Sequence, residues 1–530
     1  MGNFISGRRG MTLAAVLLSS TLATPALAQG SAAAPHKCVA FAREALGESV
    51  RINSAKHVAA GAAPTAPGQP PMAITLPAHC LVEGVINQRT GAGGKPYGIG
   101  FAIALPDDWN GRFLLMGGGG LNGTVAPPTG PVAAGERPAL VRGFAVISHD
   151  SGHKGAVFDA SFKADQRADL DFSEASVRTV TETGKAITQR FYGRKIDHSY
   201  MTGCSTGGRE GMLAAQRYPE LFDGIVVGAP AMRTGNSNLG IAYSQALFNA
   251  AGPLGKDGKP LVSEIFTAAD RATILKGLLD QCDGLDKLKD GMIMNVAQCK
   301  FSPAKLQCKS GKQDGCLSKA QVSAMDKAFA GPKDKAGYAL YMAVPYDTGI
   351  VDTAGFIPGY LPTGKPGPLG RPNMETTIDL DARINAIRAD AGQRLTDTNY
   401  WTNLSTYLGH GGKILFYHGV SDPWFSALDT WDYWQRAQAA NGKEAWDQAS
   451  RFYMVPGMGH CGGGNAFDRF DLLSAVVDWV ETDKAPEAVT SSRSSAPGET
   501  RPMCPFPAFA QHEGGDPKQA ASFSCKTPES

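Results

Sequence analysis

The sequence predicts an α/β protein with a mostly parallel sheet and one large insertion, and three observations support this class. Between Arg112 and Ala229, short apolar runs alternate with segments of helical spacing, as in parallel strands joined by crossover helices. Residues 231–404 lose this rhythm and contain Gly/Pro stretches and amphipathic helices. The rhythm resumes at Lys413 to Tyr417, another apolar run typical of a buried strand.

The chain before Ala229 predicts the order of its elements. Residues 29–75 are rich in Ala, Pro and Gly, with a short helical patch from Cys38 to Leu46, and strand character begins at Cys80. A helix is expected from Thr179 to Tyr192. Core strands are expected at Arg112 to Met116, Phe144 to Ser148, Ser199 to Met201 and Gly224 to Val227.

One pentapeptide lies between a predicted strand and a predicted helix. Gly203-Cys204-Ser205-Thr206-Gly207 has the form G-x-S-x-G, and the helix-like run Glu210 to Tyr218 follows it. In this context the motif is typical of a nucleophile elbow, a tight turn that exposes a reactive serine. The sequence therefore predicts an α/β-hydrolase fold with a large inserted lid domain, and Ser205 as the nucleophile.

Four consecutive glycines, Gly117 to Gly120, follow the predicted strand that ends at Met116. Glycines let the backbone approach a ligand closely. In hydrolases of this architecture, the loop after an early strand supplies one N–H group to the oxyanion. Taken alone, the run favours a flexible turn.

A nucleophilic serine needs a base, and the base needs an acid that orients it. The chain order in this fold is serine, acid, histidine. Asp422, just past the strand predicted to end at Tyr417, and His460, in a glycine-flanked loop, satisfy that order. The alternatives are His153, His410 and His418 as the base and Asp429, Asp432 and Asp468 as the acid.

Composition and charge exclude several function classes. The 530 residues are 43% hydrophobic and 19% charged, as in a globular protein. The formal net charge is +2, and Arg8 and Arg9 are the only charges in residues 1–28, so the remainder carries 49 − 49 = 0. Without a basic excess, neither a nucleic acid nor an anionic membrane surface is an expected partner.

Residues 1–28 have the pattern of a signal peptide. Arg8-Arg9 precede a short apolar run from Met11 to Leu22, and Ala26-Leu27-Ala28 provides a small-residue cleavage site. The run is too short to span a bilayer, and no later segment is a candidate span. A secreted or periplasmic location is expected, and both the Sec and the Tat export routes stay open.

Ten cysteines, an even number without C-x-x-C spacing, fit an oxidised, exported protein and disfavour a zinc site. Cys204 immediately precedes Ser205, and Cys461 immediately follows His460. A disulfide between these two cysteines would join the nucleophile loop to the base loop. The alternative is that each pairs with another cysteine.

A tight acidic segment runs from Asp283 to Met292. Its carboxylates, Asp283, Asp286 and Asp290, are hard oxygen ligands that suit Ca²⁺. The spacing is not that of an EF-hand, because the second carboxylate comes one place late and the distal Glu is absent. Taken alone, the segment favours a solvated acidic turn.

Together these motifs resemble the tannase and feruloyl esterase family, which includes the mono(2-hydroxyethyl) terephthalate hydrolases. The residues that carry the resemblance are Gly203 to Gly211, Ser421-Asp422, and Pro456 to Cys461. The family's signature is a cysteine before the catalytic serine bonded to a cysteine after the catalytic histidine. The resemblance implies Ser205, Asp422 and His460 as a catalytic triad, with Thr206 and Gly120 as oxyanion donors.

The same resemblance implies a metal and a set of disulfides. The family's structural Ca²⁺ maps onto the side chains of Asp283, Asp286 and Asp290 and the carbonyls of Leu288 and Met292. The implied disulfides use every cysteine: Cys38–Cys80, Cys204–Cys461, Cys282–Cys299, Cys308–Cys316 and Cys504–Cys525.

Substrate choice is expected to involve the residues after the acid. The run from Asp422 to Asp429 resembles that of the terephthalate monoester hydrolases, in which an aromatic residue three places past the acid packs on the substrate ring. Phe425 has this position, and Trp424 lies beside it. Between Tyr341 and Lys413, however, the chain is shorter than in those enzymes. No stretch there matches their carboxylate-reading arginine loop, although Arg371 and Arg383 lie nearby.

The expected protein is therefore a secreted, monomeric serine carboxylesterase that acts on small esters of aromatic acids, of the feruloyl esterase type. Its expected parts are a signal peptide (1–28), the hydrolase domain (29–230 and 405–530) and an inserted lid domain with the calcium site (231–404). Terephthalate monoester hydrolase or tannase activity is the alternative. A peptidase and a non-catalytic binding protein on the same fold are remoter ones.

Overall fold

The computed structural model describes residues 1, 33–63, 74–352, 359–364 and 373–529. The predicted signal peptide and Arg371 lie outside these residues. None of the helices in the described part of the chain combines the length and apolar character needed to cross a bilayer.

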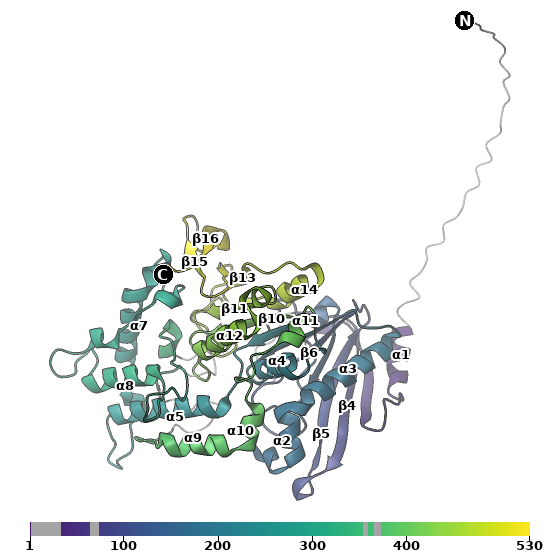
Figure 1. The fold of residues 1–530 in the computed structure, drawn as a ribbon, viewed down its shortest axis with the longest axis horizontal. Coiled ribbons are helices and arrows are strands. Elements are labelled where there is room, and N and C mark those ends of the chain that lie inside the picture. Colours follow the sequence, from purple (N-terminus) through teal and green to yellow (C-terminus); the bar gives the residue numbers. More distant parts are fainter. Residues whose placement is uncertain (2–32, 64–73, 353–358, 365–372, 530) are drawn as a thin grey trace.

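A nine-stranded sheet organises the molecule, in the order β1-β4-β5-β7-β6-β8-β9-β10-β11 (Figure 1). The pairs from β1 to β7 are antiparallel, and those from β7 to β11 are parallel. The strands are β1 (Val50–Val58), β4 (His79–Thr90), β5 (Pro96–Pro106), β6 (Arg112–Met116), β7 (Ala145–His149), β8 (His198–Cys204), β9 (Gly224–Gly228), β10 (Lys413–Gly419) and β11 (Ser450–Val455).

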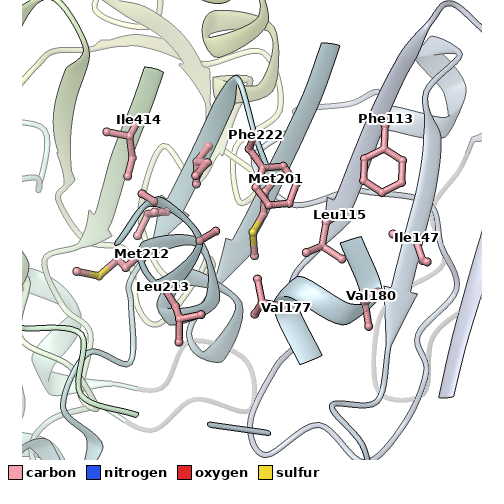
Figure 2. Close-up of a cluster of buried hydrophobic side chains, with 14 of the residues drawn as sticks. Phe113, Leu115, Ile147, Val177, Val180, Met201, Met212, Leu213, Phe222 and Ile414 are labelled. Carbon is pink, nitrogen blue, oxygen red and sulfur yellow. The ribbon is translucent and has the colours of Figure 1, made fainter. Parts of the chain in front are cut away.

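Helices cover both faces of the parallel part. Phe113 and Leu115 of β6 point to one face, where they join Val180 of α3 and Leu213 of α4 in a single buried cluster (Figure 2). Leu114 belongs to the cluster on the opposite face, which includes buried side chains of α14. The helices over the parallel part are α3 (Ser176–Tyr192), α4 (Thr206–Arg217), α11 (Ser405–Gly409), α12 (Ala427–Asn441), α13 (Lys443–Asp447) and α14 (Leu472–Thr482). Helix α1 (Ala33–Phe41) packs on β1 and β4 of the antiparallel part.

The structure confirms the predicted parallel strands. They could be recognised in the sequence because a strand that is buried on both faces is a continuous apolar run. The predicted elbow helix starts at Thr206, four residues earlier than the helical pattern suggested. The structure also contains a strand that the composition of residues 29–75 did not indicate. This strand, β1, is a sheet edge whose residues are mostly half-exposed or exposed, so it lacks an apolar pattern.

The segment between β9 and β10 contributes no strand to the sheet in its described part. Its helices are α5 (Thr234–Ala251), α6 (Val262–Ile265), α7 (Ala268–Cys282), α8 (Lys319–Ala330), α9 (Leu380–Ala389) and α10 (Ala391–Thr396). Helices α5, α7 and α8 lie at the side of the molecule away from β4 and β5 (Figure 1) and share a separate apolar cluster that contains Phe248, Ile274 and Phe329. We call residues 231–404 the inserted segment.

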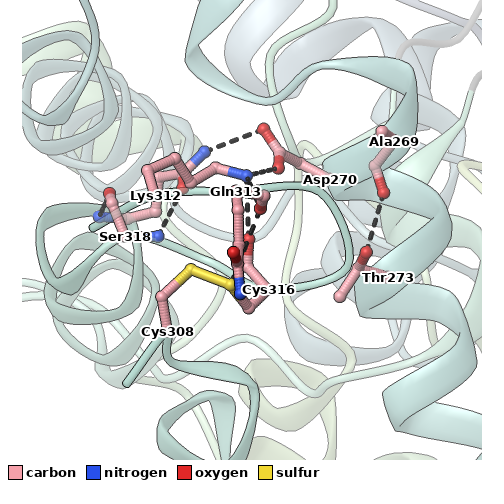
Figure 3. The surroundings of a disulfide bond; sticks show 9 residues. Ala269, Asp270, Thr273, Cys308, Lys312, Gln313, Cys316 and Ser318 are labelled. Atoms are coloured by element: carbon pink, nitrogen blue, oxygen red, sulfur yellow. Dashed lines mark hydrogen bonds and ion pairs between the residues drawn. A yellow bond between two sulfur atoms is a disulfide. The ribbon is translucent and has the colours of Figure 1, made fainter. Parts of the chain in front are cut away.

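Polar contacts fix the loop between α7 and α8. Lys312 reaches the carboxylate of Asp270 in α7 at 2.6 Å, next to the Cys308–Cys316 disulfide (Figure 3). Asp270 also closes a capping box with Thr267 at the start of α7. The inserted segment is therefore held by its own core, caps and disulfide.

The C-terminal strands pack beside the inserted segment. β15 contacts the 3-10 turn at Asp283–Asp286, and a small cluster joins Phe523 to Leu288. The remaining elements are α2 (Gln166–Leu170), β2 (Gly61–Ala62), β3 (Thr75–Leu76), β12 (Arg469–Phe470), β13 (Val489–Ser492), β14 (Thr500–Met503), β15 (Phe509–His512) and β16 (Phe523–Lys526).

Candidate active site

Ser205 lies on the sharp turn between β8 and α4, with φ 63° and ψ −120°. A positive φ is unfavourable for any residue other than glycine, and backbone strain of this kind is common at functional sites. The turn closes because its neighbours lack side chains. A Cβ on Gly203 would lie 2.3 Å from the Gly207 carbonyl oxygen, and one on Gly207 would lie 2.8 Å from that of Gly118. The backbone is thus that of a nucleophile elbow.

His460 and Asp422 meet at the carboxyl edge of the same sheet, beyond β11 and β10. The His460 Nδ1 atom lies 2.6 Å from Asp422 Oδ2, and both side chains are buried. The partner of Nδ1 is an acceptor, so Nδ1 carries the proton and Nε2 keeps its lone pair. Nε2 is buried without a hydrogen-bond partner among the described residues.

Four donors surround the Asp422 carboxylate. Its Oδ1 accepts the backbone N–H groups of Trp424 (2.8 Å) and Phe425 (3.1 Å). His418 Nε2 lies 3.2 Å from the same Oδ2 that binds His460. Burial alone would raise the pKa of this carboxyl, but the two histidines outweigh burial and hold the pKa below its usual value. Asp422 is therefore ionised.

The other candidate bases and acids are engaged elsewhere. His153 stacks on Phe162 at 3.7 Å, and burial lowers its pKa to about 4, while His410 is exposed. The remaining acids each have other partners: Asp429 binds Arg233, Asp432 binds Arg436, and Asp468 binds Ser494. Of these candidates, Asp422 and His460 form the pair, and His418 supports the acid from its other side.

A disulfide joins the elbow to the histidine loop. Cys204 and Cys461 are bonded across 257 residues of sequence, and Cys461 also has a positive φ of 66°. The bond fixes Ser205 and His460, one residue from each cysteine, in a common frame. The structure has the five disulfides that the family resemblance implies.

The glycine loop after β6 lies beside the elbow. The Thr206 hydroxyl donates to the Gly120 carbonyl, which fixes that peptide against the start of α4. The N–H of Thr206 is the first of α4, where a helix provides no internal acceptor. Glu210, which the sequence analysis did not single out, is fully buried and accepts the Gly118 N–H at 2.8 Å. Its charged type in the Gly-rich run after the elbow is the signal that could have identified it.

Aromatic rings surround the histidine. Trp424 and Phe425 lie with their ring centroids 4.8 and 5.3 Å from that of His460. Both line a small cavity between the acid loop and Tyr341 of the inserted segment. A larger cavity of about 790 Å³ opens over β4 and β5, and its lining includes none of Ser205, Asp422 and His460.

The acidic turn differs from the solvated turn that its sequence alone favoured. Asp286 is completely buried, and burial raises its pKa to about 7. The Asp283 carboxylate accepts hydrogen bonds from the backbone N–H groups of residues 290–292. Arg501 donates to Asp290 at 2.8 Å. Asp286 Oδ2 and Asp290 Oδ1 are buried without a hydrogen-bond partner in the described part of the chain. No cluster of three or more acidic, His or Cys side chains in the described residues is arranged to bind a metal.

Sequence comparison identifies the family. A profile described as tannase and feruloyl esterase matches residues 80–363 and 369–526. The chain belongs to the tannase and feruloyl esterase family. This esterase is 37% identical to the mono(2-hydroxyethyl) terephthalate hydrolase of Piscinibacter sakaiensis, over 91% of its own chain and 90% of that relative. It is 30% identical to a probable feruloyl esterase of Arthroderma benhamiae, covering 80% of its own chain and 81% of that protein.

Solved structures share the fold of the esterase. It matches feruloyl esterase B from Aspergillus oryzae with a TM-score of 0.74 and 24% identity, over 93% of this chain and 100% of that one. Tannin acyl hydrolase from Aspergillus niger matches with a TM-score of 0.70 and 20% identity, over 93% and 95%. The protein is a carboxylic ester hydrolase with an α/β-hydrolase-type fold.

Replacing Cys204 and Cys461 together by alanine should lower the free energy of unfolding by about 2–4 kcal/mol. Without the cross-link, the unfolded chain has more conformational entropy. It should also remove most of the activity, since nothing covalent would then hold Ser205 beside His460. Thermal unfolding and initial rates on an aryl ester measure the two effects.

The matched control is the double alanine variant of Cys308 and Cys316, which close a loop of 8 residues far from Ser205 in the chain. It should unfold at a lower temperature than the parent and keep its activity below that temperature. Peptide mapping of active enzyme that found Cys204 and Cys461 as free thiols would contradict the proposed coupling.

Proposed function

We propose that this esterase hydrolyses esters of aromatic acids through an acyl-enzyme on Ser205. The observation that carries the proposal is the His460–Asp422 pair, in which His460 Nε2 has no hydrogen-bond partner among the described residues. A disulfide joins the loop of this histidine to the strained elbow of Ser205. The family supports the same class of chemistry. This arrangement supplies a nucleophile, its base and an orienting acid.

In the proposed mechanism, His460 Nε2 accepts the Ser205 hydroxyl proton while Ser205 attacks the ester carbonyl. The imidazolium is stabilised by the ionised Asp422. The N–H groups of Thr206 and Gly120 stabilise the oxyanion. His460 then protonates the leaving alcohol, and a water molecule activated by the same histidine releases the aromatic acid.

Feruloyl-type esters are the first substrate class that we propose. The aromatic side chains of Trp424 and Phe425 beside His460 suit a flat acyl ring. A terephthalate monoester carries a second carboxylate, which an arginine would recognise. Arg383, one candidate for that role, lies on α9 and pairs with Glu375 at 2.8 Å. The terephthalate monoester stays the second candidate, because the relative with that name is 37% identical.

Ser205→Ala should abolish ester hydrolysis and leave the melting temperature close to that of the parent, because the hydroxyl supplies chemistry and little packing. The assay is a panel of methyl ferulate, chlorogenate, methyl gallate and mono(2-hydroxyethyl) terephthalate. The highest kcat/KM is expected on the feruloyl and chlorogenic esters. Equal rates for the parent and Ser205→Ala would refute the mechanism, and a preference for the terephthalate monoester would replace the proposed acyl group.

We also propose export, with removal of residues 1–28, and a monomeric state. The signal-peptide pattern supports export. Five disulfides fit an oxidising compartment.

We further propose that Asp283, Asp286 and Asp290, with the carbonyls of Leu288 and Met292, hold a structural Ca²⁺. Support comes from one buried oxygen each of Asp286 and Asp290 that has no hydrogen-bond partner within the described residues, since a buried carboxylate needs a cation or a proton. The ion would neutralise the turn where it meets β15. Its place in the sequence, far from Ser205, argues for an effect on the order of the inserted segment.

This proposal predicts a pH-dependent calcium effect. Without calcium, the folded protein holds a proton on Asp286 more tightly than the unfolded chain does. That contribution to stability is complete below about pH 4, the ordinary pKa of Asp, and is lost as the pH rises through about 7. Added calcium should therefore raise the melting temperature by several degrees at pH 8 and much less at pH 5.

Asp286→Asn is the matched control, because it removes the charge and keeps the shape. It should lose both the pH dependence and the calcium response. Chelation should weaken substrate binding more than it slows the chemical step. If exhaustive chelation, verified by metal analysis, changed neither the melting temperature nor KM, Arg501 alone would account for the stability of the turn.

A further inference from the structure

A second buried carboxylate touches the catalytic loops from outside the triad. Asp347 belongs to the inserted segment, immediately before a 3-10 helix at Thr348–Val351. It is completely buried. One of its oxygens, Oδ2, accepts two hydrogen bonds from regions that are distant in sequence, and Oδ1 has no partner among the described residues.

The first of these bonds reaches the acid loop. The Ser421 hydroxyl donates to Asp347 Oδ2 at 2.6 Å, and the same hydroxyl accepts the Gly349 N–H at 3.0 Å. Ser421 is therefore fixed as donor and acceptor by two residues of the inserted segment. Its chain neighbour is Asp422, so these bonds limit where the acid's backbone lies.

The second bond reaches the histidine loop. The Gly457 N–H donates to Asp347 Oδ2 at 2.7 Å, three residues before His460. Gly457 has a φ of 73°, and a Cβ there would lie 2.2 Å from the Asn465 carbonyl oxygen, so this loop has little room to shift. A single carboxylate oxygen thus holds both loops.

The contact between the inserted segment and these loops is also close. A Cβ on Gly349 would lie 2.6 Å from Ser421 Oγ and 3.1 Å from the Gly457 carbonyl oxygen. Burial raises the pKa of Asp347 against the effect of its two donors. Burying a carboxylate is costly unless it accepts hydrogen bonds. Asp347 accepts from both loops, and few other side chains could do so.

We propose that Asp347 is a positioning residue that sets the distance between the Asp422 and His460 loops, so that docking of the inserted segment completes the triad. Asp347 acts through Ser421 and Gly457 and does not touch the reacting atoms. The inference rests on the proposed function, because it assigns a role relative to that triad. It explains how a segment outside the sheet can control the rate of the chemical step.

The test uses Asp347→Ala and Asp347→Asn in the full-length protein. A misplaced base or acid costs rates of about 10²-fold when the shift approaches 1 Å. We therefore expect kcat to fall by about 10- to 100-fold in Asp347→Ala, with KM changed much less. Asp347→Asn keeps one oxygen that can still accept from both loops, so it should lose less kcat than Asp347→Ala. If Asp347→Ala does not fold, Asp347→Leu, which has no acceptor and a similar size, should show the loss of kcat.

Ser421→Ala tests the route of the effect. It should lower kcat in the same direction, and the double variant with Asp347→Ala should lose less than the product of the two single losses. Labelling of Ser205 by a fluorophosphonate supplies a readout that does not depend on the ester. Its rate should fall in parallel with kcat.

Asp270→Asn is the control, because Asp270 is another buried carboxylate of the inserted segment and bonds only within that segment. It should lower the melting temperature and leave kcat and labelling unchanged. Wild-type kcat and labelling rates in folded Asp347→Ala would overturn the proposal, even if the melting temperature fell. Failure of the proposed function would give a different result. In that case Ser205→Ala would hydrolyse the ester at the parent's rate, and the fluorophosphonate would still label it.

Discussion

The disulfide between Cys204 and Cys461 is the constraint on which the catalytic edge depends. The elbow and the histidine loop leave different strands, β8 and β11, and each contains a residue with positive φ next to the bond. Backbone strain at two adjacent loops persists only where the surroundings enforce it. The bond supplies that enforcement, and the serine and the base take their positions from it.

Hydrogen bonds complete what the disulfide begins. Asp422 is held by two backbone N–H groups and by His418. Glu210 holds the glycine loop through the Gly118 N–H. Both acidic side chains are buried and accept hydrogen bonds from backbone N–H groups, as buried polar groups usually do. These bonds position the acid and the glycine loop without a bound substrate, an arrangement suited to electrostatic stabilisation of a transition state.

The sequence predicted the parts whose chemistry leaves a local pattern. Parallel strands appear as apolar runs, and the elbow appears as a pentapeptide between a strand and a helix. The edge strand β1 was missed, because its half-exposed residues carry no such run. Asp347 was missed for another reason. Its partners lie 74 and 110 residues away, and the surrounding Pro-Tyr-Asp-Thr has no feature that marks the aspartate. The burial of Asp286 likewise depends on C-terminal strands that its own turn does not reveal.

The disulfides lie either within the inserted segment or outside it. Two bonds, Cys282–Cys299 and Cys308–Cys316, close within the inserted segment, whereas both cysteines of the Cys204–Cys461 bond lie outside it. All ten cysteines are used in the five bonds, so no disulfide joins the inserted segment to the sheet. The length of the chain between β9 and β10 can therefore change without breaking a disulfide, provided that Asp347 keeps its contacts with the two catalytic loops. The position of the inserted segment relative to the catalytic loops therefore depends on non-covalent contacts such as those of Asp347, together with the backbone at its two ends.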